Sequence, residues 1–328
     1  MHVRMGDATT EGGTGRAPAP SRRRRLALAI GAGLLGGGVV WALRQRELLD
    51  ALRHVSPARI AVLLGLSATA LVAQAMRFRV AARAFGARLG IAESVGTTLV
   101  NGMAQLCAPA RTGLLVRAAY LQAAHGVSLA RYGALTITSE LVLFAVAALL
   151  GAGCALAARP PHLVLGALFC LAAVAVAAVY AACGWMGTTV RNLPRLGERL
   201  HDFRTGLGVW RQRPVEAGRL AAWSALVIAL HALRLAASFA AIGTAVSLTD
   251  VMVVQAAVAL SIFVAVTPGG LGLKEGVVVA VAAALGIDAG VAVLASLVDR
   301  AVSVLELLAG GLVATPLLVR RTVSHAPG

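Results

Sequence analysis

The chain carries an internal repeat, and this repeat restricts its fold more than any other feature. Landmark residues of the first half return in the second half in the same order and at a nearly constant offset. The pairs are Arg77 and Arg234, Gly86 and Gly243, Glu93 and Asp250, Pro109 and Pro268, Gly113 and Gly272, Gly126 and Gly286, and Glu140 and Arg300. Both copies are strongly apolar and are broken by a Pro-x-x-x-Gly element. This pattern is typical of membrane transporters whose discontinuous helices form a site at bilayer depth.

The composition indicates a polytopic membrane protein, with 59% hydrophobic and 13% charged residues. No polar stretch is long enough for a soluble catalytic domain of ordinary size. The net charge of the chain is +16, and the arginines that contribute to it cluster beside apolar runs. There they set orientation and meet anionic headgroups, so we expect no nucleic-acid partner. The cysteines and histidines lack metal-ligand spacing, and we therefore expect no metal site and no cofactor.

The N-terminal part divides into a polar tail and a first apolar run. Residues 1–25 are rich in Gly, Thr, Pro and Ala and end in four arginines, which predicts a disordered, basic, cytoplasmic tail. The run from Leu26 to Leu43 predicts an uncleaved first helix that holds these arginines in the cytoplasm. A cleavable signal peptide is the alternative.

Residues 26–320 are predicted to form a single all-α membrane domain. It would consist of repeat A at about 58–158, a connecting helix and basic loop at 159–216, and repeat B at about 217–317. Apolar runs long enough, or nearly so, to cross the hydrocarbon predict about six full transmembrane helices. They are Leu26 to Leu43, Ile60 to Met76, Leu135 to Ala158, Leu163 to Trp185, Leu220 to Ile242 and Val291 to Val319.

Two further apolar segments contain a break. Ile91 to Gln122 is interrupted at Pro109 to Gly113, and Val251 to Leu285 is interrupted at Pro268 to Gly272. Proline and glycine end regular helix and expose backbone groups. Each segment is therefore predicted to be a broken re-entrant helical hairpin that enters the membrane and returns.

Arginine counts predict a multi-pass protein of the cytoplasmic membrane with both termini in the cytoplasm. Arginine-rich stretches around 77–88, 186–218 and 320–321 would be cytoplasmic. The arginine-containing 44–59 loop conflicts with this topology unless it lies along the interface. Three crossings would separate the helix at Arg77 from the helix at Arg234, so the two repeats are predicted to be inverted.

The broken elements carry the candidate headgroup-binding residues. In the second, Pro268, Gly269, Gly270 and Gly272 would unwind the backbone, and the next helix would present its positive end beside Lys274 and Glu275. An anionic headgroup would be satisfied there, whereas the alternative is an exposed turn between short helices.

In the first broken element, Arg111 and Arg117 flank the break and could bind phosphate. Interfacial snorkelling of these two side chains is the alternative.

Charged residues inside or at the ends of the apolar runs predict an intramembrane polar network, because a lone charge at bilayer centre costs about 2.5 to 3.5 kcal/mol. Asp299, Ser303 and Glu306 share one helix face, while Arg300 points to another helix. Glu140 and Arg300 occupy equivalent positions and could pair. The alternative is a set of ion pairs that only lock helices. The network residues are Arg77, Glu140, Arg234, Asp299, Arg300 and Glu306.

These motifs resemble the flippase-like transmembrane region of the lysylphosphatidylglycerol synthase family over roughly residues 58–317. The family pattern has Pro-x-Arg-x-Gly-acid-x-x-Arg in the first half. In the second half it has Pro-Gly-Gly-Leu-Gly-x-x-Glu followed by an acid-Arg pair. The matching residues are Pro109, Arg111, Gly113, Arg117, Pro268 to Gly272, Glu275, Asp299 and Arg300.

The chain departs from the family pattern at two places in its first half. Leu114 stands at the acid position, and Ser139-Glu140 replaces the acid-Arg pair. If the acid neutralises or relays charge, transport here is altered or lost. The soluble aminoacyl-transferring domain that the resemblance would place after the membrane region does not follow in this sequence, so we expect no synthase activity.

Three hypotheses of function follow from the sequence. The first is a protein that binds an anionic or aminoacylated lipid and translocates it between leaflets, with Arg111 and Arg117 on phosphate and Glu275 on a cationic group. The second is a non-transporting scaffold that presents lipid to a separate membrane synthase or glycosyltransferase. The third, an enzyme acting on polyprenyl phosphate, is disfavoured because no carboxylate cluster supplies an acid and a base, and we expect no enzyme.

Overall fold

A computed structural model describes residues 55–107, 112–158, 161–189, 208–210, 212–261 and 272–324. Helices and short connections make up these residues, as the sequence predicts for an all-α protein. The predicted tail, the first helix and most of both breaks, including Arg111, Pro268, Gly269 and Gly270, lie outside the described residues, whereas Gly113 and Gly272 at the ends of the breaks lie within them.

Five described helices are long and apolar enough to cross a membrane. They are α3 (Pro57–Ala84), α6 (Leu129–Ala157), α7 (Leu163–Thr189), α9 (Pro214–Ala241) and α12 (Ala289–Ser324). Each coincides with one of the predicted spans, so those five predictions are confirmed. The chain is a multi-pass membrane protein.

The segments predicted to be broken form pairs of short helices. The first pair is α4 (Ile91–Cys107) and α5 (Thr112–His125), and the second is α10 (Leu248–Ser261) and α11 (Leu273–Ala284). At about 1.5 Å per residue, helices of 12 to 17 residues are shorter than the ~30 Å hydrocarbon core.

The order of helices recurs along the chain. Helix α9 begins at a position equivalent to the start of α3, α10 at one equivalent to the start of α4, and α12 at one equivalent to the start of α6. The three pairs of starting positions are separated by the nearly constant offset seen in the sequence. Turn glycines recur as well: Gly86 and Gly243 have φ of 93° and 87°, and Gly126 and Gly286 have φ of 65° and 80°. Glycine reaches this left-handed region without steric cost, so the repeated glycines end equivalent helices in the same way.

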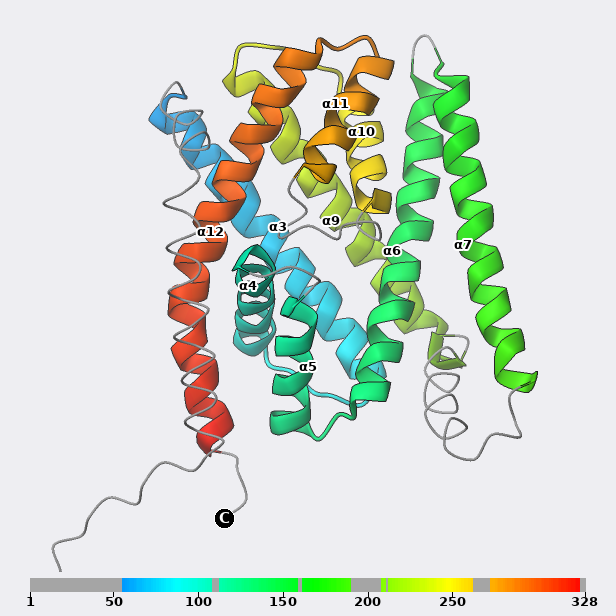
Figure 1. The fold of residues 1–328 in the computed structure, drawn as a ribbon, viewed down its shortest axis with the longest axis vertical. Coiled ribbons are helices and arrows are strands. Elements are labelled where there is room, and N and C mark those ends of the chain that lie inside the picture. Colours follow the sequence, from blue (N-terminus) through cyan, green and yellow to red (C-terminus); the bar gives the residue numbers. More distant parts are fainter. Residues whose placement is uncertain are drawn as a thin grey trace, which may run out of the picture.

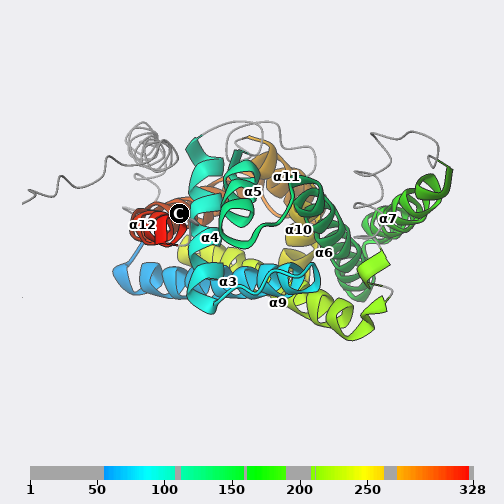
Figure 2. The same cartoon turned by 90° about the horizontal axis from the view of Figure 1, so that it is seen from below.

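Long helices at equivalent positions in the two halves run in opposite directions in Figure 1. In this view α3 descends and α9 ascends beside it, while α6 ascends and α12 descends. The α4–α5 pair lies in the lower half of the bundle, and the α10–α11 pair lies in the upper half. Seen from below, α7 stands at the edge of the bundle against α6 (Figure 2).

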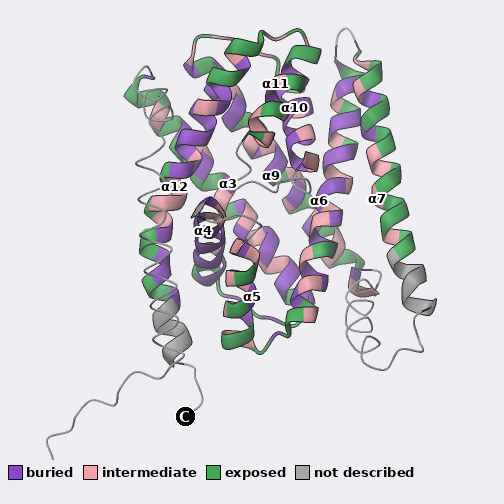
Figure 3. Ribbon diagram, viewed as in Figure 1, coloured by how far each residue is buried: buried purple, intermediate pink, exposed green. Residues whose placement is uncertain are grey.

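Helices from different halves of the sequence pack closely together. A Cβ on Gly102 of α4 would lie 2.5 Å from the side chain of Leu307 on α12, and one on Gly310 would lie 2.5 Å from that of Leu99. Small residues allow such close approach between membrane helices. The faces turned into the bundle are buried, whereas α7 is largely exposed (Figure 3). Exposed apolar faces on these helices are expected where lipid surrounds the protein.

A carboxylate ties the beginning of α4 to the end of α5. Glu93 Oε1 accepts hydrogen bonds from the Tyr120 hydroxyl and from His125 Nε2, each at 2.7 Å, and Oε2 accepts one from the Gly90 amide at 3.1 Å. Burial alone would raise the pKa of Glu93, but these hydrogen bonds outweigh it and hold the pKa below its ordinary value. The pair of short helices is therefore closed by an ionised carboxylate.

Glu93→Gln should destabilise the protein by about 1 to 3 kcal/mol at neutral pH. The lowered pKa means that the wild-type contact is fully present above the ordinary pKa of 4.5 and is lost as the pH falls through the lower folded value. Thermal unfolding in detergent between pH 7 and 3 should show the difference between the two proteins shrinking as the pH falls below about 4.5. A difference that stays unchanged well below pH 4.5 would contradict this assignment.

Candidate functional site

A cavity of about 410 Å³ lies between helices of both halves. Its size falls within the range of ordinary ligand sites. Helices α3, α4, α5, α6, α9, α10, α11 and α12 all contribute to its wall. Its charged lining residues are Arg77, Arg117, Glu140, Arg234, Lys274, Arg300 and Glu306. The structure thus brings most of the predicted network and two predicted headgroup residues to one cavity.

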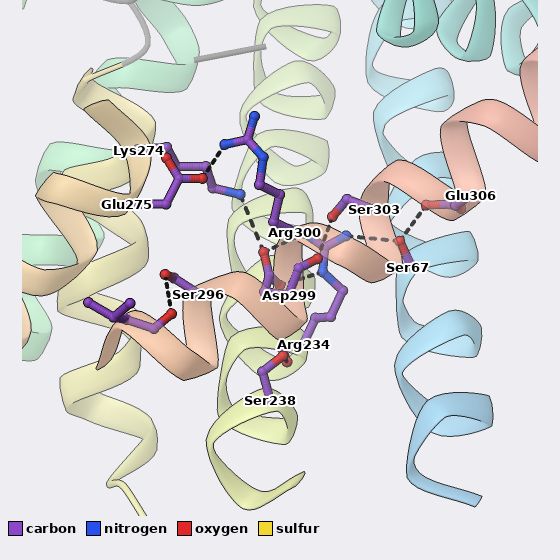
Figure 4. A network of polar contacts seen from close by, with 11 residues as sticks. Ser67, Arg234, Ser238, Lys274, Glu275, Ser296, Asp299, Arg300, Ser303 and Glu306 are labelled. Atoms are coloured by element: carbon purple, nitrogen blue, oxygen red, sulfur yellow. Dashed lines mark hydrogen bonds and ion pairs between the residues drawn. The ribbon is translucent and has the colours of Figure 1, made fainter. Parts of the chain in front are cut away.

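Arg234 and Asp299 form a buried bidentate ion pair between α9 and α12. Arg234 Nε lies 2.7 Å from Oδ1 and Nη2 lies 3.1 Å from Oδ2, with side chains 4% and 7% exposed. Lys274 Nζ lies 3.3 Å from the same carboxylate. Asp299 therefore compensates two cations, as Figure 4 shows.

A hydroxyl links this pair to Glu306. Arg234 Nη1 donates to Ser67 Oγ at 2.9 Å, and Ser67 in turn donates to Glu306 Oε2. The sequence placed Asp299 and Glu306 on one helix face, and in the structure both face the Arg234–Ser67 region. This prediction of helix geometry is confirmed.

Glu275 is occupied by contacts within the protein. Arg300 Nη1 donates to Oε1 of Glu275, and the Gly272 amide donates to its Oε2 at 2.9 Å. Gly272, with φ 81°, begins α11, so Glu275 also caps its own helix. Arg300 meets a neighbouring helix, as predicted. Among the described residues its ion pair is with Glu275, however, and Glu140 pairs with Arg77 instead of with Arg300 as suggested.

Arg77 is the counterpart of Arg234 in the first half. Its Nη2 donates to Glu140 Oε1 at 3.2 Å and to the carbonyl of Ser139 at 2.7 Å, and its Nε donates to Ser224 at 3.1 Å. Ser139 occupies the position in the first repeat that Asp299 occupies in the second. The first half therefore keeps an arginine–carboxylate pair, but its carboxylate comes from the next residue along α6.

No carboxylate among the described residues forms an ion pair in direct contact with Arg117 of α5, although Glu140 interacts with it electrostatically at longer range. Arg117 Nη2 donates to Thr98 Oγ1 at 3.1 Å, its guanidinium carbon lies 4.0 Å from the ring centroid of Phe78, and its Nε has no hydrogen-bond partner within the described ranges. Leu114, one helical turn earlier, lines the same cavity. An acid at that position would be a helical neighbour of Arg117, so Leu114 removes an intramolecular partner.

The cavity also contains polar residues that the sequence analysis did not single out. They include His231, Asn101, Gln74 and Gln255. His231 Nδ1 and Asn101 Oδ1 are buried and have no hydrogen-bond partner in the described part of the chain. In the sequence, each of these is only a single neutral polar residue within an apolar segment, which is weak evidence for a site. Such atoms are satisfied when a polar ligand or water fills the cavity.

Fold and site together define a multi-pass helical membrane protein with a polar, charged cavity between its helices. Residues 26–311 match the family described as the lysylphosphatidylglycerol synthase TM region, and the chain belongs to this family. The match covers the membrane region and no synthase domain. No curated protein matches the chain significantly.

Proposed function

We propose that the cavity binds the headgroup of an anionic or aminoacylated phospholipid and that the protein moves this lipid between leaflets. The observation that carries the proposal is Arg117, which lines the cavity with its Nε unsatisfied among the described residues. A half-buried guanidinium that faces a cavity and has no carboxylate ion-pair partner is a strong binding group for phosphate. Membership of a family named for a lipid synthase supports a role on membrane lipid.

The arrangement of the helices supports translocation. We interpret α3–α6 and α9–α12 as an inverted repeat, because α3 and α9 run in opposite directions and so do α6 and α12. The short-helix pairs lie toward opposite ends of the bundle, as expected for two re-entrant hairpins. In such folds a site between the repeats is reached alternately from the two sides. Both termini would then be cytoplasmic.

The ion pairs would act as the framework around the lipid. Arg234 and Asp299 hold α9 on α12, and Arg77 and Glu140 hold α3 on α6. These residues satisfy one another, so they position the cavity wall without needing the ligand. Arg117 is then the group that gains most when phosphate arrives. Arg111, Pro268, Gly269 and Gly270 would contribute further headgroup contacts from the breaks.

Arg117→Gln should slow lipid scrambling in proteoliposomes at least about tenfold, because it removes the charged phosphate contact. Transbilayer movement of a fluorescent phospholipid, measured with dithionite, checks this. Leu114→Glu should have a similar effect by placing a carboxylate one helical turn from Arg117. Arg219→Gln is the matched control, since Arg219 is 58% exposed and pairs with Glu216.

Unchanged scrambling in both cavity variants would refute this role for Arg117. Wild-type protein that binds phospholipid but scrambles none would favour a scaffold that presents lipid to a partner enzyme. A pull-down of a membrane synthase or glycosyltransferase would then be the decisive measurement.

A further inference from the structure

The charges around the cavity are paired with two exceptions. Among the described residues, the carboxylates of Glu140, Asp299 and Glu275 each lie in an ion pair with an arginine. Lys274 shares the carboxylate of Asp299. The two exceptions are Arg117 and Glu306, for which the described part of the chain supplies no ion-pair partner.

Only one of the two carboxylate oxygens of Glu306 has a hydrogen-bond partner among the described residues. Its Oε2 accepts the hydrogen bond from Ser67, whereas its buried Oε1 has no hydrogen-bond partner in the described ranges. Ser67 is itself held by Arg234, which fixes the orientation of the carboxylate (Figure 4). A buried carboxylate oxygen without a partner is costly unless a donor occupies the adjacent space.

The two exceptions have opposite sign, come from different helices and line the same cavity. Arg117 comes from α5 and Glu306 from α12, and both line the 410 Å³ space. A purely anionic ligand would satisfy Arg117 but would leave the Oε1 of Glu306 without a hydrogen-bond partner. A ligand with one anion and one N–H cation would complete both pairs.

We propose that the cavity selects a zwitterionic headgroup with one phosphodiester and one primary ammonium, and that Glu306 is the residue that recognises the ammonium. This inference rests on the proposed function, because Arg117 holds the phosphate of the same headgroup. It moves the cation-binding role from Glu275, which Arg300 already occupies, to Glu306. Recognition by charge pairing predicts that net-neutral headgroups bind more tightly than net-anionic ones.

The test compares binding of short-chain phosphatidylethanolamine and short-chain phosphatidylglycerol to the purified full-length protein by isothermal titration calorimetry. Wild-type protein should bind the ethanolamine lipid at least about tenfold more tightly, the factor expected for one charge-assisted hydrogen bond. Glu306→Gln should remove this preference by weakening the binding of the ethanolamine lipid alone. Arg117→Gln should weaken the binding of both lipids. Glu216→Gln, which lies outside the cavity, should change the binding of neither lipid.

The outcomes separate this inference from the proposed function. Equal binding of both lipids by wild-type protein, or equal losses for both in Glu306→Gln, would overturn the role of Glu306 and leave Arg117 intact. Glu306→Asp, which keeps the charge, should retain a preference for ethanolamine even if Glu306→Gln folds poorly. Binding of neither lipid would instead overturn the proposed function. Free phosphoethanolamine that binds as tightly as the lipid would support the charge pairing but reject lipid as its source.

Discussion

Asp299→Asn should be among the most destabilising single substitutions in this protein. It leaves Arg234, whose side chain is 4% exposed, without its carboxylate and leaves Lys274 without the same partner. Breaking a buried ion pair from one side costs about 3 to 5 kcal/mol, because the remaining charge stays buried and uncompensated. We expect a loss of this size in reversible unfolding in mixed detergent and dodecyl sulfate, with lower yield of folded protein.

A double-mutant cycle shows whether the loss of stability comes from breaking the Arg234–Asp299 ion pair. Arg234→Gln with Asp299→Asn should be less destabilised than the sum of the single variants, since no unpaired arginine remains at this position. Glu216→Gln, at a surface pair on the same helix as Arg234, should cost at most about 0.5 kcal/mol. If Asp299→Asn is as stable as this control, the pair does not hold α9 and α12 together.

The ion pair between Arg77 and Glu140 in the first half should stabilise the protein less than the Arg234–Asp299 pair does. Glu140 has a side chain 27% exposed and a single contact of 3.2 Å to Arg77, while the carbonyl of Ser139 accepts a second hydrogen bond from that arginine. The Ser139 carbonyl and the Ser224 hydroxyl also accept hydrogen bonds from Arg77, so loss of Glu140 leaves fewer of its donors unsatisfied. The two halves thus use related residues with unequal strength.

The sequence predicted the positions of the helices better than the partners of their charges. Helix length, apolar runs and the spacing of glycine and proline are local properties, and they identified the five described spans and the four short helices. The face shared by Asp299 and Glu306 also follows from local geometry. In contrast, the partners of Arg300 and Glu140 depend on how α11 and α3 approach, which helical spacing does not contain.

The neutral part of the cavity was also beyond sequence reasoning. His231 and Asn101 are single polar residues in apolar helices, and such residues are often satisfied by their own backbone. Their burial without partners among the described residues becomes visible only when α4 and α9 are placed beside the same space. Leu114 was recognised as a departure from the family pattern. Its consequence for Arg117 required knowing that both residues face this cavity.

Gly113 is the other position at which a small change should have a large effect. A Cβ there would fall well inside van der Waals distance of the Asn101 backbone carbonyl, and it would lie 2.8 Å from Gln105 Cγ and 2.9 Å from Asn101 Oδ1. A backbone carbonyl within α4 cannot turn aside as a flexible side chain can. Gly113→Ala should therefore force α5 away from α4 and cost about 3 kcal/mol or more in the same unfolding assay.

The displacement should also affect the lipid site, because α5 carries Arg117 and α4 carries Thr98, its hydrogen-bond partner. We expect Gly113→Ala to lose phospholipid binding in the fraction that remains folded. Gly133→Ala on α6 is the matched control: a Cβ there meets nothing within 4 Å. It should gain up to about 1 kcal/mol from helix propensity and leave binding unchanged. Equal stability of the two alanine variants would mean that α4 and α5 do not pack at Gly113, and the placement of Arg117 in the cavity would lose its structural basis.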